Sequence, residues 1–180
     1  ALEKASVCVI SDYGKGVVQE EYLQKIIAAW RSKGKPVLVD PHVGHFRWYR
    51  GATIITPNTK EASSFYGIEL NTDELLTSVG FRMREELGLH ALLITRGEDG
   101  MSLYMPDGKQ IHIPTVATSV YDVTGAGDTV ISLLAAAFAV EPFAAEEGLY
   151  VDPRTGITYV AIPAGEFLMG SDSGSGDEKP

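Results

Sequence analysis

Gly125, Ala126, Gly127 and Asp128 place a carboxylate directly after a glycine-rich turn, where an apolar helical pattern begins. The first backbone N–H groups of a helix lack partners within the helix and attract anions, and glycine lets a phosphate approach them without a Cβ in the way. This arrangement predicts an anion hole at the helix start, with Asp128 beside it as a general base. The alternative is that Asp128 only interacts favourably with the helix dipole.

Polar residues also follow four apolar runs that we expect to be strands. Because helical patterns separate these runs, they should connect by right-handed crossovers into a parallel sheet, whose C-terminal strand ends share one edge. Ligands of such sheets bind at that edge. The polar segments are 11–15, 40–41, 56–58 and 95–97. Any one of them alone can be a plain surface loop, but four at one edge favour a ligand site.

Hydrophobic spacing and end signals predict the elements that position these residues. Strands are predicted at 5–11, 36–39, 52–56, 91–94, 101–105 and 110–113, and helices at 20–33, 60–66, 72–87 and 126–140. The last two strands should form a hairpin, because Pro106-Asp107-Gly108 is a turn signal between them. The last helix is apolar on every side after its first turn, which predicts that it is buried. The fold class is therefore α/β, with a parallel sheet flanked by helices.

Composition limits the classes of protein. Among 180 residues, 15 are Lys or Arg and 24 are Asp or Glu; the net charge of −9 argues against non-specific binding to nucleic acid. No apolar run is long enough to span a bilayer, which excludes a membrane protein. The single cysteine, Cys8, excludes an internal disulfide framework, and we expect a cytoplasmic setting. No signal-type segment follows Ala1, and we expect the chain to begin inside a longer protein.

Three motifs, in this order, resemble those of the ribokinase-like (PfkB) carbohydrate kinase family. Asn58-Thr59-Lys60-Glu61 is similar to the family's Asn-x-x-Glu magnesium and phosphate motif. Thr95-Arg96-Gly97 with Gly100 is similar to its nucleotide-phosphate loop, and residues 122–129, which contain Asp128, are similar to its C-terminal signature. The resemblance implies a three-layer ribokinase-like fold, of which this chain holds only the C-terminal half.

Several stretches are similar to one group within that family, the kinase domains of bacterial bifunctional ADP-heptose synthases. They are 11–16, 40–41, 49–53, 56–58, 100–103 and 120–124. The resemblance implies ATP-dependent phosphorylation of D-glycero-D-manno-heptose 7-phosphate at the anomeric oxygen, in ADP-heptose and lipopolysaccharide core biosynthesis, with Mg2+ as the metal. It leaves open whether the complete protein is a homo-oligomer.

The resemblance also implies residue roles in catalysis and metal binding. Asp128 takes the proton from the sugar hydroxyl, and the backbone N–H groups of Gly125, Ala126 and Gly127 form the anion hole. Asn58 and Glu61 lie one helical turn apart and hold Mg2+ through water or phosphate. The alternative for this pair is a helix N-cap with a first-turn acid.

Further residues are assigned to the two substrates. Thr95, Arg96, Gly97 and Gly100 are the nucleotide-binding residues, although Arg96 can equally be a surface charge. Asp12, Lys15 and Asp40 are the residues on the sugar side, and for Asp12 and Lys15 a solvated loop is an equal alternative.

The chain also departs from the family pattern. His42 stands where the family usually has Lys after Asp-Pro, and family members carry about as much sequence again before the first strand. After Val140 the usual helix is replaced, and residues 158–171 resemble the opening of formylglycine-generating-enzyme (sulfatase-modifying factor) domains. We therefore predict a kinase portion at 1–145 and a linker with the start of a second domain at 146–180.

These departures leave two alternatives to a working sugar kinase. The chain can be a catalytically incomplete module that binds nucleotide weakly or not at all, or a piece that serves a C-terminal sulfatase-modifying-type domain. The histidines do not change this choice, because His42, His45, His90 and His112 lack metal-ligand spacing. His42 and His45 are predicted to be polar surface residues.

Overall fold

The computed structural model describes residues 4–115, 126–139, 149–151 and 158–160. The chain divides into two units, Ala1–Glu141 and Pro142–Pro180. The first unit holds the predicted site. In the second unit the described residues form two strands, β7 (Leu149–Val151) and β8 (Thr158–Val160), which pair antiparallel. The remaining residues of the segment that resembles sulfatase-modifying domains lie outside the described residues.

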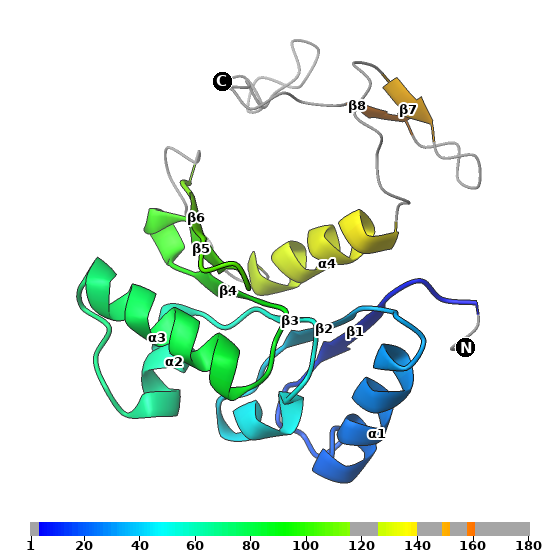
Figure 1. Cartoon of the computed structure of the whole chain (residues 1–180), viewed down its shortest axis with the longest axis horizontal. Helices are drawn as coiled ribbons and strands as arrows, with labels where there is room; N and C mark the ends of the chain where they lie inside the picture. Colours follow the sequence, from blue (N-terminus) through cyan, green and yellow to red (C-terminus); the bar gives the residue numbers. More distant parts are fainter. Residues whose placement is uncertain (1–3, 116–125, 140–148, 152–157, 161–180) are drawn as a thin grey trace, which may run out of the picture. The chain divides into compact units, whose positions relative to one another are not determined.

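A six-stranded sheet forms the centre of the first unit (Figure 1), and its strand order follows the order along the chain. Four strands run parallel: β1 (Cys8–Ser11), β2 (Val37–Asp40), β3 (Ile54–Ile55) and β4 (Ala91–Thr95). The hairpin of β5 (Met101–Tyr104) and β6 (Gln110–Ile113) then adds two antiparallel strands, so the sheet is mixed.

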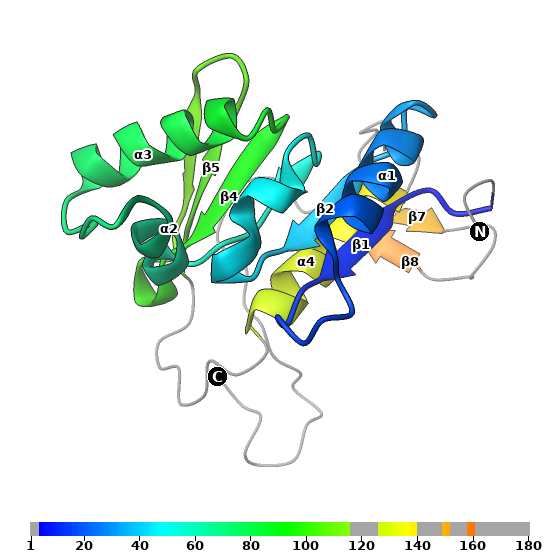
Figure 2. The same cartoon turned by 90° about the horizontal axis from the view of Figure 1, so that it is seen from below.

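Helices cover both faces of this sheet and make three layers (Figures 1 and 2). One face carries α1 (Glu20–Arg31), the 3-10 helix η1 (Val43–Tyr49), α2 (Thr59–Tyr66) and α3 (Asp73–Glu86), and the other face carries α4 (Ala126–Ala139). Successive strand residues point to opposite faces: Val37 and Val39 pack in the core beneath α1, and Leu38 packs in the core beneath α4. The α/β class and the three layers predicted above are confirmed.

The helix ends follow the signals in the sequence. Glu20 and Glu21 lie in the first turn of α1, and Gly34 follows its end with a φ of 67°, a backbone conformation that favours glycine. Thr72 caps α3, because its hydroxyl accepts a hydrogen bond from Leu75 N. None of the helices in the described part of the chain combines the length and the hydropathy that a membrane span requires.

Two strands are shorter than their apolar runs. Within the run at 5–11 the strand is β1, and within the run at 52–56 it is the two-residue β3. In the second case residues on both sides of β3 also bond to β2, because Thr53 N donates to the carbonyl of Val37 and Thr56 N to that of Val39. The apolar run therefore marks the buried segment, and the strand proper is its central part.

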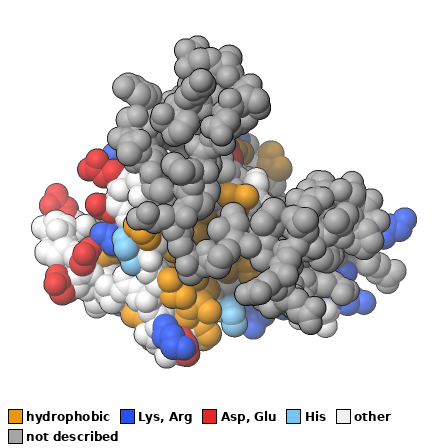
Figure 3. Space-filling model, turned by 90° about the horizontal axis from the view of Figure 1, so that it is seen from above, with side chains coloured by type: hydrophobic (Ala, Val, Ile, Leu, Met, Phe, Trp, Pro, Cys, Tyr) orange, Lys and Arg blue, Asp and Glu red, His pale blue; other side chains and the backbone are white. Residues whose placement is uncertain are grey.

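The prediction that α4 is buried on every side is wrong for this structure. Its inner face packs on β1 and β2 through Ile131, which is 3% exposed. On its outer face Leu133 is 66% and Phe138 is 40% exposed. Figure 3 looks onto the side of the molecule that carries α4, and hydrophobic side chains lie at the surface there. The sheet covers one side of a helix only, so a helix that is apolar all round keeps an apolar outer stripe.

Candidate functional site

A cleft of about 930 Å³ lies where the carboxyl ends of β2, β3 and β4 meet the first turns of α2 and α4. This volume is in the range of small-molecule sites, and the place is the strand edge predicted to bind ligands. Most of the predicted site residues line it: Asp40, Asn58, Glu61, Thr95, Arg96, Gly97, Gly100, Gly127 and Asp128. The topology thus brings together residues that are far apart in the sequence.

Other predicted residues do not line the cleft. Lys15 is exposed in the loop after β1. Asp12 is buried beneath that loop, and its carboxylate contacts protein groups. Ala126 is the first residue of α4, where only its backbone is described, and Gly125 lies outside the described residues.

Two carboxylates, Asp40 and Asp128, line the cleft and interact electrostatically. Asp40 ends β2, and its Oδ1 lies 3.7 Å from the position that a Cβ on Gly127 would take. Burial raises the pKa of Asp40, and the nearby charge of Asp128 raises it further, while the hydroxyl of Ser11 partly offsets both by donating to Asp40 Oδ2 over 3.3 Å. Burial and the neighbouring carboxylate thus both disfavour the ionised form of Asp40.

Asn58 and Glu61 form a capping box at the start of α2. Asn58 Oδ1 accepts from Glu61 N over 2.9 Å, and Glu61 Oε2 accepts from Asn58 N over 2.7 Å. Burial raises the pKa of Glu61, and the charge of Asp40 adds to this effect. The pair is thus a helix N-cap with a first-turn acid, as the alternative interpretation predicted. The capping box holds both side chains at the cleft wall.

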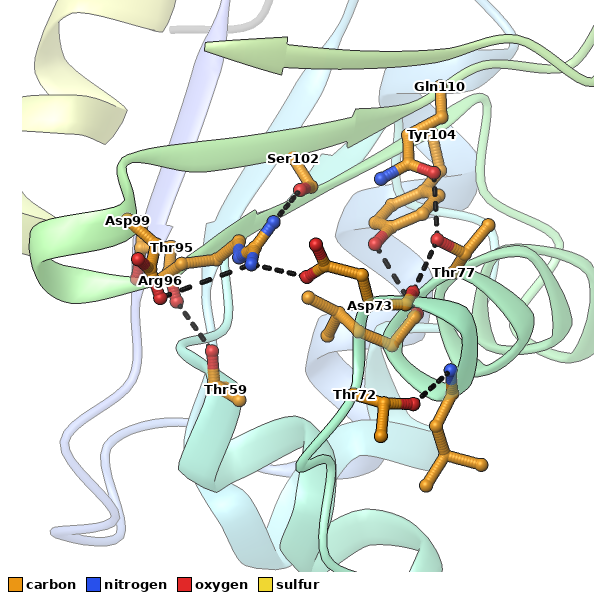
Figure 4. A network of polar contacts seen from close by, with 12 residues as sticks. Thr59, Thr72, Asp73, Thr77, Thr95, Arg96, Asp99, Ser102, Tyr104 and Gln110 are labelled. Atoms are coloured by element: carbon orange, nitrogen blue, oxygen red, sulfur yellow. Dashed lines mark hydrogen bonds and ion pairs between the residues drawn. The ribbon is translucent and has the colours of Figure 1, made fainter. Parts of the chain in front are cut away.

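The loop after β4 is built around Arg96 (Figure 4). The guanidinium is 14% exposed; it pairs with Asp73 of α3 over 2.6 Å and donates to Ser102 Oγ of β5 over 3.4 Å. Thr59 Oγ1 of α2 donates to the carbonyl of Thr95 over 3.2 Å. These contacts fix the loop against α2, α3 and β5, and they show that Arg96 is not a free surface charge.

The loop after β1 is anchored by a buried aspartate that the sequence analysis assigned to the sugar side. Asp12 Oδ1 accepts from Gly14 N over 2.9 Å, and Oδ2 accepts from the hydroxyl of Tyr49 over 2.7 Å. His45 Nδ1 lies 2.8 Å from the same Oδ2, and the ring of His45 stacks on Trp48. The prediction that His45 is a surface residue is therefore wrong, because its ring links the loop to η1.

Tyr13 is a cleft residue that the sequence analysis missed. Its side chain lines the cleft, and its hydroxyl donates to Asp128 Oδ1 over 3.2 Å. The polar segment at 11–15 pointed to this loop, but nothing in residue type singled out the tyrosine within it.

The donor atoms of the cleft suit a hard, hydrated cation. In the described part of the chain no group of three or more His, Cys, Asp or Glu side chains is arranged to hold a metal directly. The cleft nevertheless carries the carboxylates of Asp40, Glu61 and Asp128. Mg2+ prefers oxygen ligands and keeps several of its waters, so these side chains fit a cation held through water and phosphate.

Comparison with known proteins identifies the family. Residues 1–143 match the family described as pfkB family carbohydrate kinase. The chain belongs to this family. Its pfkB region is 52% identical over 134 residues to the Bifunctional protein HldE of Geotalea uraniireducens (strain Rf4), a match that covers 74% of this chain and 27% of the relative. The family match ends at residue 143, and the resemblance of the C-terminal segment to sulfatase-modifying domains is unsupported.

Solved structures share the fold of the first unit. A ribokinase of Arabidopsis thaliana, complexed with ribose and ATP, matches with a TM-score of 0.62 and 22% identity over 76% of this chain and 44% of its own. Phosphofructokinase-2 of Escherichia coli, in complex with potassium, matches with a TM-score of 0.67 and 20% identity over 77% of this chain and 46% of its own. The chain thus spans less than half of either kinase.

Proposed function

We propose that this chain carries the phosphoryl-transfer half of an ATP-dependent sugar kinase. The observation that carries the proposal is the cleft itself, where Asp128, the pair of Asn58 and Glu61, and the loop from Thr95 to Gly97 line one space. We further propose D-glycero-D-manno-heptose 7-phosphate as the sugar. Its support is the similarity of the motifs to those of ADP-heptose synthases and the 52% identity to a bifunctional protein HldE. A cytoplasmic setting belongs to the same proposal.

The reaction transfers the γ-phosphoryl group of ATP to the anomeric hydroxyl. The hydroxyl oxygen attacks the γ-phosphorus, the bond from that phosphorus to the oxygen of ADP breaks, and the hydroxyl proton moves to the carboxylate of Asp128. Backbone N–H groups at the start of α4 stabilise the charge that develops on the transferred group. Thr95 and Gly97 hold the nucleotide phosphates, and Asp40 orients the sugar.

The charge of the cleft explains why a cation belongs to the reaction. Asp40, Glu61 and Asp128 repel the phosphates of ATP, whereas Lys60 and Arg96 are the cationic residues among those that line the cleft. Mg2+, when bound, supplies positive charge that offsets the phosphates. Asn58 and Glu61, at the start of α2, would hold it through its waters.

The test is Asp128→Asn in this chain, with ADP release measured with and without the heptose 7-phosphate. We expect sugar-dependent turnover to fall by about two orders of magnitude or more, because a proton acceptor is lost. ATP affinity, measured by calorimetry with Mg2+, should hardly change. Asp107→Asn, in the exposed turn between β5 and β6, is the matched control. Near-normal turnover in Asp128→Asn would contradict the role of this residue as base.

A second function is favoured by one observation, the span of less than half of the solved kinases. In this alternative the chain is a nucleotide-binding module without sugar turnover of its own. Calorimetry with ATP and Mg2+ distinguishes the two functions when it is combined with the ADP-release assay. Binding without sugar-dependent ADP release supports the module, and sugar-dependent release by the chain alone refutes it.

A further inference from the structure

Tyr13 makes a hydrogen bond across the cleft, from the loop after β1 to the first turn of α4. Its hydroxyl donates to Asp128 Oδ1 over 3.2 Å. The two residues lie 115 positions apart in the sequence, so only the folded first unit brings them together. The ring of Tyr13 is 64% exposed and lines the cleft, which places the bond at the cleft surface.

The residues before and after Tyr13, Asp12 and Gly14, are held in place by contacts with the rest of the first unit. Asp12 is 6% exposed, and its carboxylate accepts hydrogen bonds from Gly14 N and from the hydroxyl of Tyr49. Gly14 has a φ of 66°, and a Cβ at this position would lie 2.5 Å from Nε2 of His42. Another residue there would be strained by the backbone and would displace the imidazole. The backbone at Tyr13 is thus held on both sides, while its side chain extends into the cleft.

Tyr49 also holds the loop after β1, because its hydroxyl donates a hydrogen bond to the carboxylate of Asp12. Its side chain is fully buried, and burial together with the adjacent carboxylate of Asp12 raises its pKa above the ordinary value. Tyr49 therefore stays protonated and remains a donor to Asp12, and its oxygen accepts from His42 N over 2.9 Å. The loop is held in place before any substrate binds, so Tyr13 loses little freedom when it bonds to Asp128.

We propose that Tyr13 is a positioning residue for Asp128. The inference rests on the proposed function, in which Asp128 accepts the proton of the sugar hydroxyl. The phenol holds Oδ1 and fixes the rotation of the carboxylate, so Oδ2 is the oxygen that receives the proton. Tyr13 keeps its own proton throughout, and the bonds that form and break are those of phosphoryl transfer alone. An exposed carboxylate without this bond would rotate freely and spend less time in the reactive geometry.

The test compares Tyr13→Phe with Tyr22→Phe in the 180-residue chain. Both changes remove one hydroxyl and keep the ring, and Tyr22, on α1, is 62% exposed and does not line the cleft. The first readout is the carboxyl 13C signal of Asp128 in chain labelled at aspartate, assigned through Asp128→Asn. We expect Tyr13→Phe to move this signal and Tyr22→Phe to leave it in place. An Asp128 signal that is the same in Tyr13→Phe and wild type overturns the proposal.

The second readout separates this inference from the proposed function. In sugar-dependent turnover, Tyr13→Phe should lower kcat about tenfold, the usual effect of one hydrogen bond to a charged group, with KM for ATP unchanged. An unchanged kcat in an active chain overturns the proposal even if the signal moves. A moved signal in a chain that never turns over sugar supports the positioning contact and refutes the proposed function instead.

Discussion

At the scale of single residues, Asp40 and Asp12 are two carboxylates at strand ends whose surroundings shift their pKa values in opposite directions. Asp40 is partly buried beside another acid, and Asp12 is buried among donors. A group that serves substrate binding can lower the stability of the folded protein. A carboxylate that anchors a loop, in contrast, receives its hydrogen bonds from the protein itself. The pH dependence of stability can therefore assign a role to each aspartate.

We predict that Asp40→Asn stabilises the first unit at pH 7. Burial and the charge of Asp128 raise the pKa of Asp40 above its ordinary value of 3.8, so ionised Asp40 disfavours the folded state at neutral pH. This penalty disappears below pH 3.8, where both states are protonated. Thermal unfolding should show a higher midpoint for Asp40→Asn at pH 7 and a smaller difference at pH 3. A lower midpoint at pH 7 would contradict the electrostatic account.

For Asp12→Asn we predict the opposite sign. Burial would raise the pKa of Asp12, but hydrogen bonds from His45, Gly14 and Tyr49 outweigh it and hold the pKa below 3.8. The carboxylate therefore adds stability above pH 3.8, and this contribution is lost as pH falls through the lower folded pKa. We expect Asp12→Asn to lose about 1–3 kcal/mol at pH 7. Urea denaturation checks this, and a loss that is as large at pH 3 would argue against it.

Strand-end positions singled out Asp40 and Asn58, the glycine-rich helix start singled out Asp128, and the resemblance to the Asn-x-x-Glu motif added Glu61. The sequence did not reveal the partners of Asp12. Tyr49 and His45 come from a 3-10 helix after the next strand, and no periodicity in the chain says which of its side chains face back to the first loop. Contacts of this kind depend on tertiary packing, which a local pattern does not contain.

At the scale of elements, the start of α2 has two tasks that can be separated. The capping box needs an acceptor at residue 58 and a Glu or Gln at residue 61. The proposed contact with hydrated Mg2+ needs the negative charge of Glu61. One pair of residues can therefore stabilise a helix end and take part in the reaction, and both interpretations offered by the sequence can hold together.

Glu61→Gln and Asn58→Ala should separate these tasks. Glu61→Gln keeps the box, so we expect unchanged or higher stability, since burial and Asp40 raise the pKa of Glu61. The Mg2+ concentration for half-maximal ADP release should rise about tenfold. Asn58→Ala loses the cap and should cost about 1 kcal/mol in urea denaturation. If Glu61→Gln destabilises the fold as much as Asn58→Ala, the two tasks are not separable.

Helices were easier to predict than strands for a physical reason. A helix carries its end signals in its own sequence, as Glu20, Gly34 and Thr72 do here. A strand ends where its partner stops pairing, and that limit lies in another part of the chain. β3 is a two-residue strand within a longer apolar run, and the bonds that Thr53 and Thr56 make to β2 depend on where β2 lies.

At the scale of the whole molecule, the outer face of α4 is the feature that the sequence analysis mispredicted. An apolar pattern around a helix indicates that burial on all sides is favourable. It does not show which other segment or molecule covers each side. In the first unit the sheet covers the inner face, and Leu133 and Phe138 remain accessible on the outer one. Accessible apolar surface of this kind promotes association.

We predict that the chain self-associates in a concentration-dependent way through this face. Leu133→Glu should shift sedimentation velocity profiles towards the monomer, because it places a charge in the apolar contact. Leu75→Glu is the matched control, since Leu75 is also an exposed leucine on a helix, α3, on the opposite face of the sheet. If both variants sediment like the wild type, α4 is not the contact surface.

The sheet order, which follows the chain order, has a consequence for how the protein is made. Each strand pairs with the strand synthesised just before it, so a chain emerging from the ribosome can extend the sheet one strand at a time. α4 differs, because it returns to β1 and β2 after all six strands exist. Asp128 therefore reaches Tyr13 only when the layer on that face closes. A partly synthesised chain already carries the cleft loops, and Asp128, the proposed proton acceptor, joins them after the six strands.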